Sequence, residues 1–121
     1  MSQQPLGEAF KHAADGIIYP LLHERNFKIE VGFGIAAVIL GLFFSIDLTQ
    51  WAVIAVCVGL VLSGECVNTS LEAVVDLASP EYHELAKRAK DCAAGGVLIS
   101  SFASLFVAAF IFLPKIIDFI L

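Results

Sequence analysis

Glu65, Asn68 and Glu72 lie within residues 51–75, a segment that otherwise has the composition of a membrane-spanning helix. A carboxylate near the middle of a bilayer costs on the order of 3 kcal/mol, so such residues usually serve a function. At about 100° per residue the three share one stripe of the helix, and Asp76 continues it one turn further on. With a rise of about 1.5 Å per residue, Glu65 lies roughly 21 Å into the span and Glu72 near the far interface. The stripe suits a reaction between a lipid headgroup and a charged substrate from water.

Phosphoryl transfer is one chemistry that this set of residues could perform. It needs a neutralised triphosphate, a base or orienting group for the attacking hydroxyl, and cations around the phosphates. Glu24 and Glu72 are candidate Mg²⁺ ligands, since magnesium binds a few carboxylates together with phosphate oxygens and water. Glu65 could accept the proton of a lipid alcohol, and Asn68 could both donate and accept a hydrogen bond between the acidic groups. Lys90 offers a phosphate contact.

Other interpretations of the buried polar stripe are open at this stage. The residues could form hydrogen bonds between helices of an oligomer, although two glutamates would be a costly way to do so. A small ion or proton conductor could use the same carboxylates as a relay, but it would not need Lys90 beside Asp91 in a polar loop. A structural interaction protein would tolerate alanine at Glu65 and Glu72.

The composition predicts an all-α integral membrane protein. Hydrophobic residues make up 59% of the 121 residues and the mean hydropathy is +0.86, which is too high for a soluble domain of this size. Three spans are predicted at about 29–46, 51–75 and 93–113, the first two joined by a short turn at 47–50. Residues 1–121 are therefore expected to form a single membrane domain.

Two further helices are predicted outside the spans. Residues 5–25 carry apolar side chains at helical spacing, which is typical of an amphipathic helix on the membrane surface, and Pro20 should kink or interrupt it. The polar stretch 77–91 is predicted to form a loop and a helix leading into the third span. Ser79 is placed to cap that helix, with Pro80 in its first turn.

Charge predicts the orientation and limits the partners. The positive-inside rule places the N-terminus and the 77–91 loop in the cytoplasm and the C-terminus outside. Glu72 is then expected to face the cytoplasm, where ATP and Mg²⁺ are found. The net charge of −5 and the lack of a basic stripe argue against nucleic-acid binding. The basic residues on the cytoplasmic side are Lys11, Arg25, Lys28, Lys87, Arg88 and Lys90.

Two segments resemble the signature of a known family. Residues 64–76, GECVNTSLEAVVD, and residues 79–95, SPEYHELAKRAKDCAAG, closely resemble the prokaryotic diacylglycerol kinase family, which includes undecaprenol kinases. The resemblance extends over about residues 10–115. It is specific because the spacing Glu-x-x-Asn-x-x-x-Glu, the Glu-Tyr-His segment and the Ala-Lys-Asp segment occur together in a three-span chain.

The resemblance implies a homotrimeric lipid kinase of the bacterial cell membrane that uses ATP and Mg²⁺, with active sites near subunit boundaries. It assigns Glu65 as the catalytic base and Asn68 as the residue that orients groups around it. It assigns Glu24 and Glu72 as the metal ligands. The predicted nucleotide-binding residues are Glu81, Tyr82, His83, Lys90, Asp91 and His12, although histidines at such positions are also common as interfacial polar residues.

The resemblance favours undecaprenol as the substrate, with diacylglycerol as the alternative. Residues 24–29, 86–95 and 112–115 look more like the undecaprenol kinase branch. Two departures from that branch are Glu30, where His is common, and Asp15, where a basic residue is usual. Both lie near the expected lipid entrance and bear on the choice of lipid.

Overall fold

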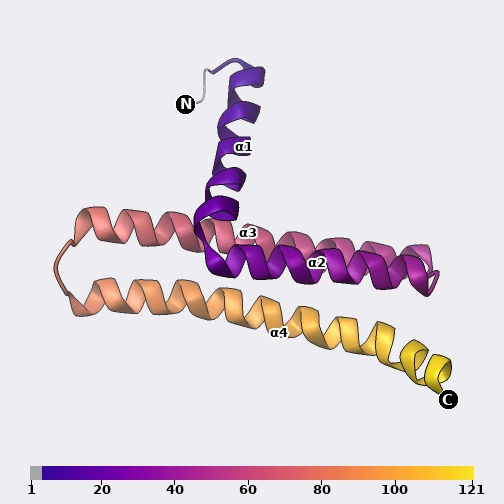
Figure 1. The fold of residues 1–121 in the computed structure, drawn as a ribbon. Helices are drawn as coiled ribbons and strands as arrows, with labels where there is room; N and C mark the ends of the chain where they lie inside the picture. The colour runs from indigo at the N-terminus through magenta and orange to yellow at the C-terminus, as the bar shows by residue number, and fades with distance from the viewer. Residues whose placement is uncertain (1–3) are drawn as a thin grey trace.

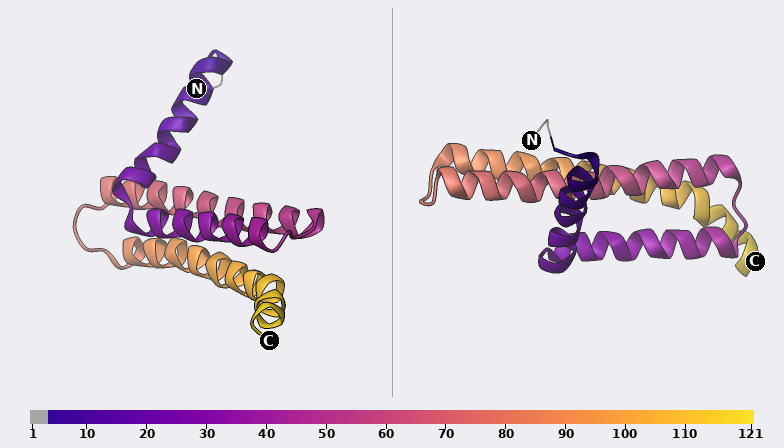
Figure 2. Two further views of the ribbon diagram at one scale, coloured as in Figure 1. Left: turned by 45° about the vertical axis from the view of Figure 1, so that its right-hand side comes forward. Right: turned by 90° about the horizontal axis from the view of Figure 1, so that it is seen from above.

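The computed structural model describes residues 4–121, which form four helices: α1 (Leu6–His23), α2 (Arg25–Phe43), α3 (Leu48–Ala78) and α4 (Glu84–Ile120). Helices α2, α3 and α4 run alongside one another, and α1 projects from them at a steep angle (Figure 1; Figure 2). Each of the three bundled helices is long and apolar enough to cross a membrane. The predicted all-α fold with three spanning helices is confirmed.

The turn between α2 and α3 differs from the prediction by a few residues. The predicted turn at 47–50 is wrong, because α2 ends at Phe43 and residues 48–50 already belong to α3. A capping box starts α3: the Gln50 N–H donates to Asp47 Oδ1 over 2.8 Å, and the Asp47 N–H donates to Gln50 Oε1 over 3.2 Å. These bonds satisfy backbone N–H groups that the start of a helix leaves without partners. With Asp47 as its cap, α3 begins at Leu48 and not at the predicted residue 51.

A small core lies at this end of the bundle. Ile46, Ile54 and Phe112 pack together and are almost completely buried. Gly41 allows α2 to approach the ring of Trp51, since a Cβ atom at Gly41 would lie 2.6 Å from the ring atom Cη2.

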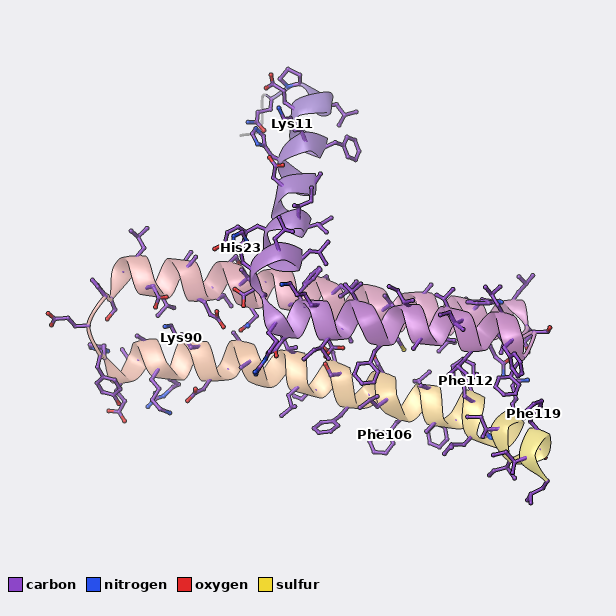
Figure 3. The ribbon with its side chains drawn as sticks, viewed as in Figure 1. Lys11, His23, Lys90, Phe106, Phe112 and Phe119 are labelled. Atoms are coloured by element: carbon purple, nitrogen blue, oxygen red, sulfur yellow. The ribbon has the colours of Figure 1, made fainter. Side chains whose placement is uncertain are left out.

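Elsewhere the bundle directs large apolar side chains outward. Phe106 of α4, for example, is 64% exposed and points away from the other helices (Figure 3). Such a surface is what lipid or a neighbouring chain requires, because the hydrocarbon core of a bilayer solvates apolar groups.

Helix α1 continues through Pro20 and ends at His23, so the predicted interruption at Pro20 is wrong in position. The chain changes direction at Glu24, whose backbone is extended (φ −106°, ψ 118°). Proline has no N–H, so Pro20 cannot donate to the carbonyl oxygen of Gly16 one turn earlier. That oxygen instead accepts a weak bond from the Cys66 thiol of α3, with Sγ and O 3.9 Å apart. The contact fixes α1 against α3.

The connection between α3 and α4 also differs from the prediction. Ser79 does not cap α4, because it ends α3 and its hydroxyl donates to the Glu81 carbonyl oxygen over 2.9 Å. His83 caps α4 instead: its Nδ1 accepts the Leu85 N–H over 3.1 Å. The prediction that the polar helix continues into the third span is confirmed, since α4 is continuous.

Helices α3 and α4 are longer than a bilayer requires. Their 31 and 37 residues correspond to about 46 and 55 Å, against a hydrocarbon core of about 30 Å. Both extend past the start of α2 at the end that carries the 79–83 connection (Figure 1). Several charged residues, among them Asp76, Lys87 and Lys90, lie on this extension.

Candidate active site

Glu65 is the one buried charged side chain within residues 4–121, with 3% of its surface exposed. It lies on α3 close to helix α1. The next residue along the chain, Cys66, contacts the carbonyl oxygen of Gly16 in α1. Glu24, Glu30 and Glu72 are its acidic neighbours. The carboxylate is thus turned into the protein, among other acidic groups, and does not face hydrocarbon.

Asn68 and Glu72 form the next part of the site. The Asn68 amide Nδ2 donates to Glu72 Oε1 over 3.0 Å, and both side chains are half-buried. The other amide atom, Asn68 Oδ1, is buried and has no hydrogen-bond partner within the described residues. An unpaired buried acceptor costs about 1–3 kcal/mol, so this oxygen marks a position where a donor or a cation would be stabilised.

The side chains near Glu65 offer oxygen atoms of the kind that bind magnesium. Glu24 is half-buried at the junction of α1 and α2. Carboxylate and amide oxygens are the ligands that Mg²⁺ prefers. Residues 4–121 contain no group of three or more His, Cys, Asp or Glu placed to hold a metal by themselves. A metal ion bound at this place would therefore need further ligands, such as phosphate oxygens and water.

A second polar region lies where α3 ends and α4 begins. It is a cavity of about 340 Å³ open to solvent. Five of the six predicted nucleotide-binding residues line it. Its full lining is Val75, Asp76, Ser79, Pro80, Glu81, Tyr82, His83, Ala86, Lys87, Lys90 and Asp91.

His12 is the predicted nucleotide-binding residue that does not line this cavity. It lies on α1 and is exposed. Helix α1 projects away from the bundle, far from the 79–83 connection (Figure 1). Within one chain, the structure does not bring His12 together with the other five residues.

Two lysines of the cavity are paired with carboxylates. Lys90 of α4 points toward α3 (Figure 3), where its Nζ lies 2.5 Å from Asp76 Oδ1. Lys87 Nζ lies 2.6 Å from Asp91 Oδ2, one turn along α4. Exposed ion pairs of this kind are weak because solvent screens them, so either lysine can exchange its carboxylate for a phosphate at little cost.

Three polar contacts in the structure were not predicted from the sequence. It placed Asp76 on the acidic stripe but did not pair it with Lys90. The spacing of Lys87 and Asp91, four residues apart on a helix, was a signal that could have revealed their pairing. The bond from Ser101 to Glu30 joins residues 71 positions apart, and no local pattern could have indicated it.

Comparison with known proteins gives a consistent result. The chain matches the family model of prokaryotic diacylglycerol kinase over residues 11–112. It is 39% identical over 111 residues to the diacylglycerol kinase of Synechocystis, covering 91% of this chain and 63% of that relative. It is 37% identical over 109 residues to the undecaprenol kinase of Bacillus subtilis, covering 90% and 89%. It is 35% identical over 79 residues to the diacylglycerol kinase of Escherichia coli, covering 65% of each.

Three helices long enough to span a membrane, a buried carboxylate and a charged cavity at one end of the bundle are features expected of a membrane protein that acts where lipid meets water. The family match and the identity to the relatives then show that the chain belongs to the prokaryotic diacylglycerol kinase family of lipid kinases. The resemblance seen in residues 64–76 and 79–95 is confirmed. The relatives carry two different names, so family membership alone does not fix the lipid substrate.

Proposed function

We propose that the protein transfers the γ-phosphate of ATP to the hydroxyl of a membrane lipid alcohol, with undecaprenol as the preferred acceptor and undecaprenyl phosphate as the product. The observation that carries the proposal is Glu65, a buried carboxylate among acidic neighbours. It lies on the same helix as the cavity residues Asp76 and Val75. One helix thus connects a group at lipid depth with a charged cavity open to water.

Glu65 is the general base in this mechanism. Its carboxylate takes the proton of the lipid hydroxyl as the hydroxyl oxygen forms a bond to the γ-phosphorus. The bond between the γ-phosphorus and the oxygen bridging to the β-phosphate breaks, and ADP leaves with that bonding pair. The proton on Glu65 then passes to water.

Glu24 and Glu72 are the carboxylates that would hold Mg²⁺, which when bound neutralises the triphosphate charge and orients the γ-phosphate. Asn68 keeps Glu72 in place through the 3.0 Å bond from its amide. The unpaired Oδ1 of Asn68 supplies a further oxygen on the same side. Asn68 would thus orient the acidic groups, which is the role that the resemblance assigns to it.

The cavity at the start of α4 would bind the nucleotide. Lys90 would contact the phosphates after exchanging its partner Asp76, while Glu81, Tyr82, His83 and Asp91 would hold the nucleoside. In the proposed homotrimer, His12 would approach the site of a neighbouring chain. The N-terminus and this cavity would lie in the cytoplasm, where ATP is found, and the C-terminus outside.

Undecaprenol is preferred over diacylglycerol because of how the relatives align. The undecaprenol kinase of Bacillus subtilis is matched over 89% of its length, whereas the diacylglycerol kinase of Synechocystis is matched over 63%. The three segments 24–29, 86–95 and 112–115 favour the same choice. Diacylglycerol remains the alternative acceptor.

The test is an assay of the purified protein in lipid vesicles with γ-labelled ATP and Mg²⁺. Undecaprenol, diacylglycerol and a short-chain alcohol are offered in parallel, and label is expected in the undecaprenol product. Glu65→Gln should abolish transfer and leave a folded protein, whereas Glu8→Gln on the exposed face of α1 should not affect it. Full activity of Glu65→Gln would refute the assigned base. Ion flux without lipid-dependent ATP use would instead indicate a conductor.

A further inference from the structure

We propose that the elbow between α1 and α2, formed by residues 20–28, holds Glu24 in place for the metal ion, with Pro20 and Cys66 as positioning residues. The inference rests on the proposed function, in which Glu24 is a metal ligand, and deepens it. The elbow is the point where α1 leaves the bundle and the chain turns into α2 (Figure 1). Both positioning residues act through the backbone that carries Glu24 and not on the metal itself.

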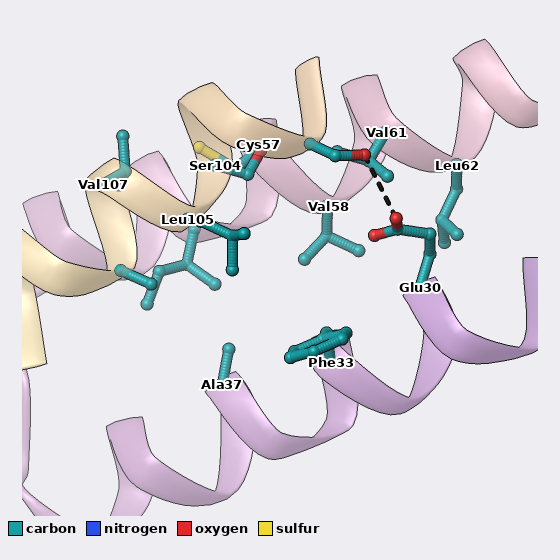
Figure 4. A pocket seen from close by; sticks show the side chains of 14 residues that line it. Glu30, Phe33, Ala37, Cys57, Val58, Val61, Leu62, Ser104, Leu105 and Val107 are labelled. Atoms are coloured by element: carbon teal, nitrogen blue, oxygen red, sulfur yellow. Dashed lines mark hydrogen bonds between the residues drawn. The ribbon is translucent and has the colours of Figure 1, made fainter. Parts of the chain in front are cut away.

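Glu24 depends on its backbone more than its acidic neighbours do. Glu72 accepts a hydrogen bond from the amide of Asn68. Glu30 accepts one from the Ser101 hydroxyl over 3.1 Å (Figure 4). Glu24 occupies the N-cap position of α2, but its side chain forms no capping bond. Its carboxylate is therefore left for a ligand, and the main chain sets its position.

The main chain of Glu24 is bonded on both sides. Its N–H donates to the carbonyl oxygen of Pro20 over 2.8 Å, and its own carbonyl oxygen accepts the N–H of Lys28 over 3.3 Å. Between these two bonds the backbone is extended (φ −106°, ψ 118°). Both polar groups of this backbone unit are thus satisfied, and a displacement of Glu24 would break one of the two bonds.

Pro20 anchors the elbow in the protein. It is the only buried residue within Leu6–His23, with less than 2% of its surface exposed, and α1 packs on both α2 and α3. On the other side of Glu24, Phe27 is also almost completely buried. The chain is therefore fixed four residues before Glu24 and three residues after it.

Cys66 joins the same elbow to α3. Proline lacks the N–H that would bond to the Gly16 carbonyl oxygen, and the Cys66 thiol donates to that oxygen instead, with Sγ and O 3.9 Å apart. A thiol is a weak donor, but this one belongs to the residue that directly follows Glu65. The last turns of α1, and with them the elbow, are thereby tied to the neighbour of the proposed base.

The test is a double-mutant cycle that needs no turnover. Binding of a radiolabelled, non-hydrolysable ATP analogue to the full chain in vesicles is measured with and without Mg²⁺. The ratio of the two Kd values reports how well the protein holds the metal. Pro20→Ala removes the buried ring and supplies an N–H for Gly16, and we expect the ratio to fall about tenfold while the Kd without Mg²⁺ stays within twofold. In a Glu24→Gln background, Pro20→Ala should change the ratio by less than twofold.

The cysteines supply a second variant and its matched control. Cys66→Ala should lower the ratio about two- to threefold, because a thiol donates only weakly. Cys57→Ala should leave the ratio unchanged, since Cys57 is a free and equally half-buried cysteine of the same helix but lies more than two turns from Cys66. Helix content should be the same in all variants, because alanine is a good helix former.

An unchanged ratio in Pro20→Ala, or an equal loss of affinity with and without Mg²⁺, would overturn the positioning role. A tenfold effect that persists in the Glu24→Gln background would overturn it too, because Pro20 would then act otherwise than through Glu24. Glu24→Gln with a wild-type ratio would instead refute Glu24 as a metal ligand, which is a failure of the proposed function itself and removes the purpose of the elbow.

Discussion

Replacing Asn68 with alanine should weaken metal binding without weakening the fold. In the structure, the Asn68 amide donates to Glu72 over 3.0 Å while its Oδ1 is buried without a partner. The substitution thus removes one useful bond and one unsatisfied atom together. Function and stability should respond differently, because only the bond orients the Glu72 carboxylate.

The expected sizes follow from these two contacts. A hydrogen bond to a charged group contributes about 1.5–3 kcal/mol, which corresponds to a rise of about 10- to 150-fold in the half-saturating Mg²⁺ concentration. In the free energy of unfolding, the lost bond is offset by removal of the unpaired Oδ1, which costs about 1–3 kcal/mol. The free energy of unfolding should therefore change by less than about 1 kcal/mol.

The assay is transfer of the γ-phosphate in vesicles over a wide range of Mg²⁺ concentrations, together with denaturant unfolding of the same protein. Activity of Asn68→Ala should recover at high Mg²⁺. Ser70→Ala is the control, because the Ser70 hydroxyl donates only to the Val67 carbonyl on the exposed side of α3. A wild-type Mg²⁺ requirement with a lower maximal rate would refute the reasoning, since Asn68 would then act otherwise than through Glu72.

Lys90→Ala should raise the KM for ATP about 10- to 100-fold, since it removes a charged phosphate contact. Asp76→Asn should leave this KM unchanged or lower it by at most about fivefold, because the exposed pair with Lys90 competes weakly with phosphate; a large rise would mean that Asp76 itself contacts the nucleotide. In unfolding experiments, Gly41→Ala should cost about 1–3 kcal/mol through its clash with the Trp51 ring. Gly59→Ala, with no atom within 4 Å of the added Cβ, should be neutral or stabilising by up to about 1 kcal/mol, and equal losses in both variants would contradict the clash.

The spanning helices could be predicted because hydropathy is a local property of the chain. Their ends could not be predicted to the residue, because several side chains compete for the same free amides. At the start of α3, Asp47 and Gln50 cap each other and bring residues 48–50 into the helix. At the start of α4, His83 takes the capping role expected of Ser79, whose hydroxyl is used elsewhere.

The grouping of five predicted site residues around the cavity at the start of α4 could be foreseen, because these residues are close neighbours in the chain; their binding of a nucleotide stays a prediction. Glu81, Tyr82 and His83 follow one another just before α4, and Lys90 and Asp91 come about two turns into that helix. His12 was grouped with them by resemblance alone. The fold of a single chain leaves it on a helix that projects away from that cavity.

The sequence alone was enough to identify the acidic side chains of the candidate site and to group them. The spacing of Glu65, Asn68 and Glu72 puts acidic groups on one helix face, because the helix repeats every 3.6 residues whatever its surroundings. The tertiary structure decided which of these groups is shielded from solvent and what stands beside it. Burial of Glu65 and the bond from Ser101 to Glu30 both require segments far apart in the sequence to meet. Such contacts depend on how the helices pack, and no periodic pattern in the sequence indicates them.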